Sequence, residues 1–256
     1  PEADDYRLLG HYATLLTELG LGDSDYLATQ QRQSASVGGI SGHVMLRSQV
    51  DDEQRLHGCF GLGSKALNRK TAEQTALLQD TLTSARFDET RRVRELISQR
   101  RARRDQAITG SGHSLAMSAA CAGMSPLARL QHEGSGLAGT RSLRRLDDSL
   151  KNEASLQEFC ERLATLHERI ASQPWELLVI GEAGSAESVA AESAKQLAVF
   201  RGSGAGGDEL RIDALREPRK ELWVTNTQVN FCARAYPTVP AGHADAAPLA
   251  VHPADS

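Results

Sequence analysis

The sequence has few aromatic residues and no excess of positive charge. Phenylalanine, tryptophan and tyrosine together make up 4% of its 256 residues. Lysine and arginine number 29 against 33 aspartate and glutamate residues, so the formal net charge is −4. Proteins that hold single-stranded nucleic acid usually combine a basic surface with aromatic stacking platforms. The composition therefore argues against nucleic acid as a partner.

Long apolar runs and a basic leader are also missing. No apolar run approaches the roughly 18 residues that a membrane-spanning helix needs. The chain opens with Pro1-Glu2-Ala3-Asp4-Asp5, the opposite of a positively charged signal-peptide start. We therefore expect a cytoplasmic protein with no membrane partner. Since it starts without methionine and opens directly into a helical pattern, we also expect a piece of something longer.

Cysteine is scarce, and its spacing is wide, with no C-x-x-C pair. Disulfide scaffolds are short and dense in cysteine, so this chain is not one. Free cysteine is among the most often buried residue types. We expect four free, buried thiols in a reducing compartment, at Cys59, Cys121, Cys160 and Cys232.

The first 67 residues predict two helices followed by a hairpin. Leucines from Leu8 to Leu19 recur at helical spacing, and Gly20 stands where a C-cap glycine belongs. A second helix is expected from about Asp25 to Ser34. The period then changes to two over 40–46 and 56–62, on either side of an acidic turn, which indicates an antiparallel hairpin. The glycines within these strands suggest close packing by a neighbouring element.

Residues 68–172 are helical in pattern. The Ser125-Pro126 pair is typical of a helix start, with an N-cap followed by proline at the first helical position. Further helices are expected near 139–150 and 153–172. The run Trp175–Ile180 then predicts a short buried strand, and a helix should follow from Ala186 to Phe200.

The sequence changes character after residue 200. We divide the chain into an α+β unit over 1–200, a flexible glycine-rich linker over 201–220, and an opening strand and helix start over 221–256. The two ends look like equivalent positions of a repeated domain whose first copy lacks its leading strand. The strand expected at 222–236 should then fill the open sheet edge, within one chain or in a strand-swapped dimer.

Motifs that carry chemistry are weak throughout. Zinc hydrolases hold two histidines and a glutamate on one helix face, as in H-x-x-E-H. The eight histidines form no such motif; His132-Glu133 and His167-Glu168 are adjacent pairs whose members point in different directions. The sequence predicts no catalytic, cofactor-binding or metal-binding residue. The eight histidines are His11, His43, His57, His113, His132, His167, His243 and His252.

Glycine-rich stretches are best explained as connections. Gly110-Ser111-Gly112 and Gly134-Ser135-Gly136 are too short for a nucleophile elbow. Gly202, Gly204 and Gly207 match G-x-G-x-x-G formally, but a helix precedes them and a charged loop follows, so we interpret them as linker.

One basic cluster and one possible oxyanion pair remain open. The cluster is either a patch for phosphate or an acidic partner, or a solvated face paired with Asp88, Glu89, Glu95 and Asp105. Arg234 and Tyr236 should share a strand face, either binding an oxyanion or lying half exposed. The cluster comprises Arg91, Arg92, Arg94, Arg100, Arg101, Arg103 and Arg104.

A series of stretches resembles the presequence-protease branch of the pitrilysin/insulinase zinc metallopeptidases. They run colinearly over about residues 10 to 240, and the series is more specific than any one of its members. The stretches are L-T-E-L-G-x-G-D-x-D-Y-L (16–27), S-V-G-G-I-S (36–41), F-G-L-G-S-K-A-L (60–67), R-R-V-R-E-L-I-S-Q-R-R-A (91–102), G-S-G-H-S-L-A-M-x-A-A (110–120), S-P-x-A-R-L (125–130), G-L-A-G-x-R-S-L (136–143) and V-N-F-C-A-R-A-Y-P (229–237).

The resemblance implies an α+β fold, with an antiparallel sheet and a large helical layer, and a place in a larger enzyme. Members carry four related domains in two bowl-like halves that enclose unfolded peptide, with the zinc motif in the first domain. This chain resembles the third domain and the opening of the fourth. The family's carbonyl-stabilising Arg and Tyr lie later in the fourth domain, so that role is not transferred to Arg234 and Tyr236.

We therefore expect a non-catalytic segment from the C-terminal half of such a metalloendopeptidase. Its partners would be the N-terminal catalytic half, which holds the zinc, and unfolded peptide. One alternative is a free-standing binding or assembly protein of the same fold, and an upstream reading frame encoding H-x-x-E-H would decide against it. A third reading, nucleic-acid binding through the arginine-rich helix, predicts salt-sensitive binding.

Overall fold

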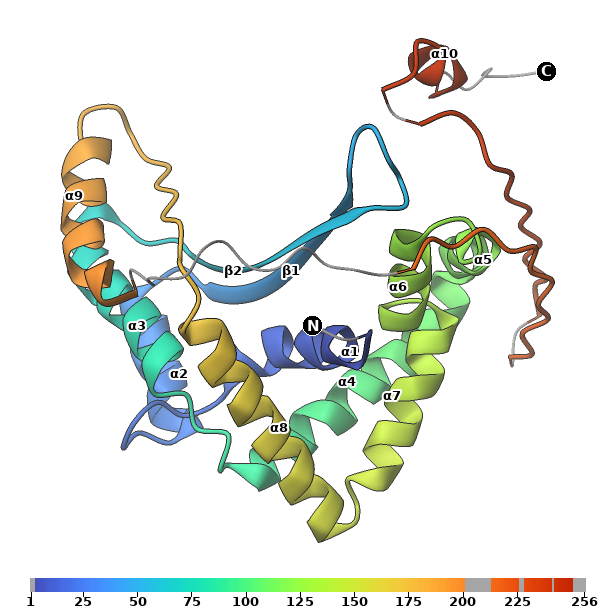
Figure 1. Cartoon of the computed structure of the whole chain (residues 1–256). Helices are drawn as coiled ribbons and strands as arrows, with labels where there is room; N and C mark the ends of the chain where they lie inside the picture. The colour runs from blue at the N-terminus through green and yellow to red at the C-terminus, as the bar shows by residue number, and fades with distance from the viewer. Residues whose placement is uncertain (1–2, 201–212, 226–227, 241, 251–256) are drawn as a thin grey trace.

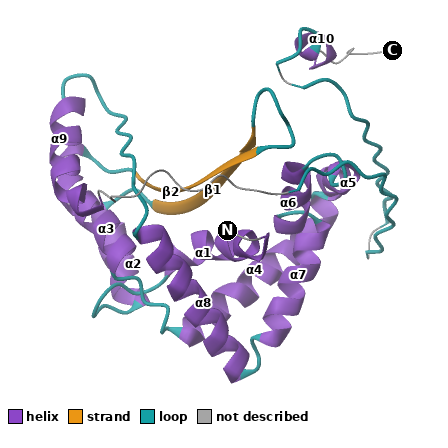
Figure 2. Cartoon of the chain, in the orientation of Figure 1, coloured by secondary structure: helices purple, strands orange, loops and turns teal. Residues whose placement is uncertain are grey.

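The computed structural model describes residues 3–200, 213–225, 228–240 and 242–250 (Figure 1). A two-stranded antiparallel hairpin packs on a large helical layer (Figure 2), which confirms the predicted α+β class. The helices are α1 (Ala3–Leu15), α2 (Tyr26–Ser36), α3 (Thr71–Thr83), α4 (Thr90–Gly110), α5 (Gly112–Cys121), α6 (Pro126–Gly134), α7 (Leu137–Ser149), α8 (Glu153–Ala171), α9 (Ala186–Gln196) and α10 (Ala246–Ala250), with 3₁₀ turns η1 (Leu16–Glu18), η2 (Asn68–Lys70) and η3 (Leu197–Phe200).

The hairpin lies where the alternating pattern predicts it. Strand β1 (Ile40–Ser48) pairs with β2 (Leu56–Ser64), and Val44 lies opposite Phe60. Side chains of β1 alternate between half-buried and exposed. Because successive strand residues point to opposite faces, one face of the hairpin is covered and the other is open.

A glycine brings α1 close to the covered face. A Cβ placed on Gly42 would lie 2.6 Å from the Ala13 carbonyl oxygen of α1. Any side chain at residue 42 would therefore push the helix away from the strand. The close packing predicted from the strand glycines is confirmed at this position.

The main core lies on the other side of α1. Figure 1 shows α1 between the hairpin and the helices α4, α7 and α8, which converge beneath it. Apolar side chains of these four helices and of the loops beside them form one buried cluster, and Phe60 and Leu62 of β2 pack against it. The cluster comprises Leu8, Tyr12, Leu15, Leu16, Leu19, Phe87, Val93, Leu96, Ile97, Leu143, Leu150, Leu156, Phe159, Cys160, Leu163 and Leu166.

Side-chain caps start two of the predicted helices. The Asp25 carboxylate accepts a hydrogen bond from the Ala28 amide at 2.8 Å and starts α2. The Ser125 hydroxyl accepts one from the Ala128 amide at 3.2 Å, with Pro126 at the first helical position of α6. These oxygens satisfy backbone donors that have no partner inside the helix, which is why the motif marks a helix start.

The first helical segment ends differently from the prediction. Helix α1 stops at Leu15 and continues as a 3₁₀ turn through Glu18, so Gly20 is not its C-cap. The left-handed backbone is at Gly22, with a φ of 57°. Gly20 instead donates its amide to the Glu89 carboxylate at 2.8 Å, a contact with a distant segment that helical spacing does not predict.

The prediction of a buried strand over 175–180 is wrong. This segment forms no ladder, and Leu178 and Ile180 are 82% and 89% exposed. Apolar composition favours an extended backbone, but a buried strand also needs a neighbouring strand to bond with. The described part of the chain places none beside it.

The strand predicted over 221–236 is also wrong where the structure describes it. Residues 221–225 and 228–236 form no ladder with the hairpin, and Leu222 and Val224 are 90% and 91% exposed. Residues 226–227 and the glycine-rich 202–207 lie outside the described residues. The short helix α10 begins at Ala246, close to the predicted start near His243.

Two of the four cysteines contradict the expected burial. Cys160 is buried and Cys121 is half-buried, but Cys59 and Cys232 are exposed. Cys59 lies opposite Met45 on the open face of the hairpin, the face that α1 does not cover. All four are free.

Candidate interaction surfaces

The two predicted His-Glu pairs place their imidazoles inside the protein. His167 of α8 shares a hydrogen bond of 2.9 Å between its Nδ1 and the Tyr12 hydroxyl. It also lies against Phe87, with ring centroids 5.3 Å apart. Burial lowers the pKa of His167, because the apolar surroundings disfavour the charged ring. His167 is therefore a neutral core residue.

His132 of α6 is buried beneath a later segment of the chain. Its ring meets the edge of Trp223 at 5.8 Å, and a Glu221 carboxylate oxygen lies 3.9 Å from Nε2. Neither ring nitrogen has a hydrogen-bond partner among the described residues. Burial, with a smaller contribution from Arg219, lowers the pKa of His132, and Glu221 and Glu133 oppose the shift.

The segment over His132 is held by contacts that the sequence pattern did not indicate. The Leu215 amide donates to the Gln54 side chain at 2.7 Å, and the Glu217 amide donates to the Gly123 carbonyl at 2.9 Å. The Arg141 guanidinium of α7 stacks on Trp223 at 4.2 Å. Such pairs join residues more than 80 positions apart, so no local signal marks them.

The arginine-rich helix α4 is partly neutralised. Arg101 bonds Asp147 at 2.7 Å and Asp148 at 3.0 Å on α7, in addition to its predicted partner Asp105 at 3.8 Å. Arg92 bonds the predicted Glu95 at 3.1 Å. These pairs neutralise two of the seven arginines of the cluster.

The other two predicted carboxylate partners act elsewhere. Asp88 pairs with Arg86 at 2.9 Å, just before α4. Glu89 accepts hydrogen bonds from the Gly20 and Tyr26 amides at 2.8 Å and 3.1 Å. Both carboxylates therefore serve the loop that precedes α4, and five arginines of the cluster have no ion pair with a described residue: Arg91, Arg94, Arg100, Arg103 and Arg104.

Arg234 and Tyr236 come together, but no strand holds them. The guanidinium lies 4.7 Å from the ring centroid, and the tyrosine is exposed. The pair is a cation–π contact on a segment without a ladder.

The short glycine motifs join helices, as predicted. Gly110 ends α4 and Gly112 opens α5, while Gly134 ends α6 and Gly136 precedes α7. No nucleophile elbow is built at either place.

The described residues do not fit the zinc ion that the resemblance implies for the parent enzyme. Among them, no three histidine, cysteine, aspartate or glutamate side chains gather closely enough to hold a metal. The described helices also include none that is long and apolar enough to cross a bilayer.

What the structure does offer is unpaired extended backbone. Within the described residues the sheet has two strands, so β1 and β2 each have an edge without a strand partner. Residues 175–180 also lie outside the ladder, and Leu177, Leu178 and Ile180 of this segment are exposed. Unpaired edges and exposed apolar runs are the usual places where another chain adds.

Comparison with known proteins identifies the family. The model of the peptidase M-16C associated family matches residues 1–146, more than half of the chain. The chain belongs to this family. The resemblance to the presequence-protease branch of the zinc metallopeptidases, inferred above from sequence motifs, is thereby confirmed.

Three relatives are presequence proteases. The mitochondrial presequence protease of Drosophila melanogaster is 25% identical over 246 residues, 94% of this chain and 23% of the relative. That of Yarrowia lipolytica is 25% identical over 252 residues, 96% of this chain and 25% of the relative. That of Danio rerio is 28% identical over 135 residues, 53% of this chain and 13% of the relative. The chain thus spans a quarter or less of the length of these relatives.

Proposed function

We propose that this chain is a non-catalytic segment of a presequence-protease-like zinc metalloendopeptidase, in which it forms part of the wall of a peptide chamber. Membership of the peptidase-associated family supports this, as do relatives named presequence proteases that are about four or more times longer. The partner is the catalytic half of the same enzyme, which carries the zinc, and the substrate is unfolded peptide.

The observation that carries the proposal is the combination of exposed apolar segments and unpaired strand edges. Leu178, Ile180, Leu222 and Val224 are large apolar side chains left in solvent. In the parent enzyme the other half covers part of this surface. An extended peptide binds the remaining edge through its backbone, as a strand added to the hairpin.

Three further expectations belong to this proposal. The division into 1–200, 201–220 and 221–256 follows the change in composition after residue 200. A strand-swapped dimer predicts that deleting 221–256 lowers the mass measured by size exclusion from that of two chains to that of one. A cytoplasmic location predicts that fractionation finds the protein outside organelles, whereas the names of the three relatives include the word mitochondrial.

Peptide binding and cleavage test the proposal directly. The purified chain, with added zinc, should bind a labelled unfolded peptide of about 20 residues in fluorescence anisotropy and leave it intact. The control is the same peptide with alternate backbone nitrogens methylated, which should bind at least about fivefold more weakly because strand addition needs N–H donors.

Two results would contradict the proposal. Cleavage of the peptide that a chelator abolishes would show that the chain is catalytic by itself. Equal binding of the methylated and unmodified peptides would rule out strand addition.

A further inference from the structure

The arginines of α4 differ in how they are surrounded. Val93, Ile97, Arg100 and Arg104 follow one another at intervals of four, three and four residues, so they lie on one stripe of the helix. The first two are fully buried against the core. The stripe therefore directs Arg100 and Arg104 toward α1, while Arg94 is exposed.

The two elements meet at a polar contact. The Arg100 Nη1 donates to the Gly10 carbonyl of α1 at 3.0 Å and lies 3.3 Å from the His11 Nδ1. Arg101, the next residue, has three carboxylate partners. No carboxylate of the described residues lies within ion-pair distance of Arg100, Arg103 or Arg104.

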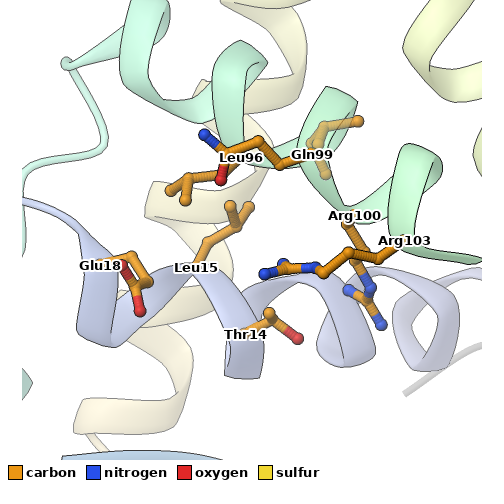
Figure 3. A pocket seen from close by; sticks show the side chains of 8 residues that line it. Thr14, Leu15, Glu18, Leu96, Gln99, Arg100 and Arg103 are labelled. Carbon is orange, nitrogen blue, oxygen red and sulfur yellow. The ribbon is translucent and has the colours of Figure 1, made fainter.

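A pocket opens beside these arginines. It has a volume of about 80 Å³ between α1 and α4, and Leu15 and Leu96 form part of its apolar floor. Figure 3 shows Arg100 and Arg103 reaching from α4 toward Thr14 at one end, with Glu18 at the other. The volume is enough for a few water molecules, and so for one small oxyanion.

The acidic end of the pocket is already neutralised. The Glu18 carboxylate accepts hydrogen bonds from Arg92 at 3.3 Å and from Gln30 at 2.9 Å. The basic end has no such compensation. Burial, and then the nearby Arg104 and Arg103, lower the pKa of Arg100 to about 10. Positive charge is thus concentrated at a half-buried place without its counter-charge.

We propose that Arg100 and Arg103 bind a small oxyanion in the pocket between α1 and α4. The guanidinium group is planar and presents a fork of N–H donors that matches two oxygens of phosphate or carboxylate. The proposal stands on this local geometry and is independent of the proposed chamber role. Inorganic phosphate and the carboxylate of an acidic segment share the required chemistry, and the experiment distinguishes them.

Titration with simple anions at constant ionic strength tests the site. Inorganic phosphate and acetate are added separately to the full chain, with chloride as reference, and backbone amide NMR shifts are followed at Thr14 and Gln99. We expect saturable shifts with one or both anions. Arg103→Ala, at an exposed position that should not disturb folding, should weaken binding about tenfold.

A matched variant distinguishes anion binding in the pocket from nonspecific attraction of anions to the basic helix α4. Arg94→Ala removes the same charge from an exposed position of the same helix and should leave the affinity unchanged. Saturation by phosphate alone, by acetate alone or by both supports the site and identifies its ligand class. Shifts no larger than those with chloride, or equal weakening by Arg94→Ala and Arg103→Ala, would overturn it.

Discussion

At single residues, the chain keeps three imidazoles uncharged: His132 and His167 are buried, and His11 is half-buried. His132 and His167 have lowered pKa values because they are buried. The pKa of His11 falls to about 3, first because of burial and then because Arg100 and Arg104 lie nearby. A neutral ring packs among apolar side chains at much smaller cost than a charged one. Each histidine therefore ties stability to pH.

Acid should weaken the fold through these histidines. Below about pH 6.5 an unfolded histidine takes up a proton that the folded, buried one does not, so stability falls as the pH falls. Each such histidine contributes up to about 1.4 kcal/mol per pH unit. The unfolding free energy from urea titration should therefore decrease between pH 6.5 and pH 5.

One substitution identifies the source of this dependence. His167→Gln removes a titrating group from the core, so the slope between pH 6.5 and pH 5 should become shallower, whatever the stability at pH 7. His243→Gln, at an exposed position, serves as the control. An unchanged slope in the His167 variant would show that its imidazole does not carry the effect.

At the level of elements, the contact between α1 and the hairpin organises the fold. Helix α1 contributes Leu8 and Tyr12 to the main core on one side and supports β1 on the other. Gly42 permits this arrangement, because its missing side chain leaves room for the Ala13 carbonyl. The close contact between β1 and α1 therefore depends on residue 42 having no side chain.

A methyl group at this contact should be costly. Gly42→Ala places Cβ 2.6 Å from the Ala13 carbonyl oxygen, so strand and helix must separate, which should cost about 1–3 kcal/mol of unfolding free energy. Gly63→Ala on β2 is the matched control, since its Cβ would meet only atoms at 3.8 Å and beyond. Its effect should stay within about 0.5 kcal/mol. Equal effects of both variants in denaturant titration would refute the close-packing account.

At the scale of the whole molecule, the late segment 213–223 closes over the corner formed by α5, α6 and α7. It bonds Gln54 and Gly123, and Arg216 pairs with Glu53. Trp223 completes this closure, packing between the His132 ring and the Arg141 guanidinium. Figure 1 shows the segment running past α6 and α5 before it leaves the helical layer.

Removing the indole should loosen this segment without unfolding the core. Trp223→Ala takes away both ring contacts, so trypsin should cut within 216–220 at least about threefold faster. Water would also reach His132, whose pKa should rise toward its ordinary value in an NMR titration. Leu222→Ala, at a neighbouring position that is 90% exposed, should change neither measurement. Unchanged cleavage and an unchanged His132 pKa in the Trp223 variant would show that the indole does not hold the segment.

Much of the local structure follows from local rules. Helical spacing of leucines, the Ser125-Pro126 start and the alternation over 40–46 and 56–62 predicted elements that the structure confirms. Local rules failed at Trp175–Ile180, which has the composition of a buried strand but no partner strand among the described residues. They also failed at Cys59, whose exposure depends on which face of the hairpin α1 covers.

The candidate site was predictable only in part. The arginine cluster stands out in the sequence, and the spacing of Val93, Ile97, Arg100 and Arg104 already places two arginines on the core-facing stripe. Which arginines keep their charge unpaired depends on carboxylates that α7 and the end of η1 bring within bonding distance.

The sequence by itself determined the helices, the hairpin and the family, because periodicity, capping and motif order depend on near neighbours along the chain. Only the tertiary structure decided which charges are neutralised, which histidines are buried and which apolar segment is exposed to solvent. Those properties depend on distances between segments far apart in the chain, and such distances arise only when the elements pack.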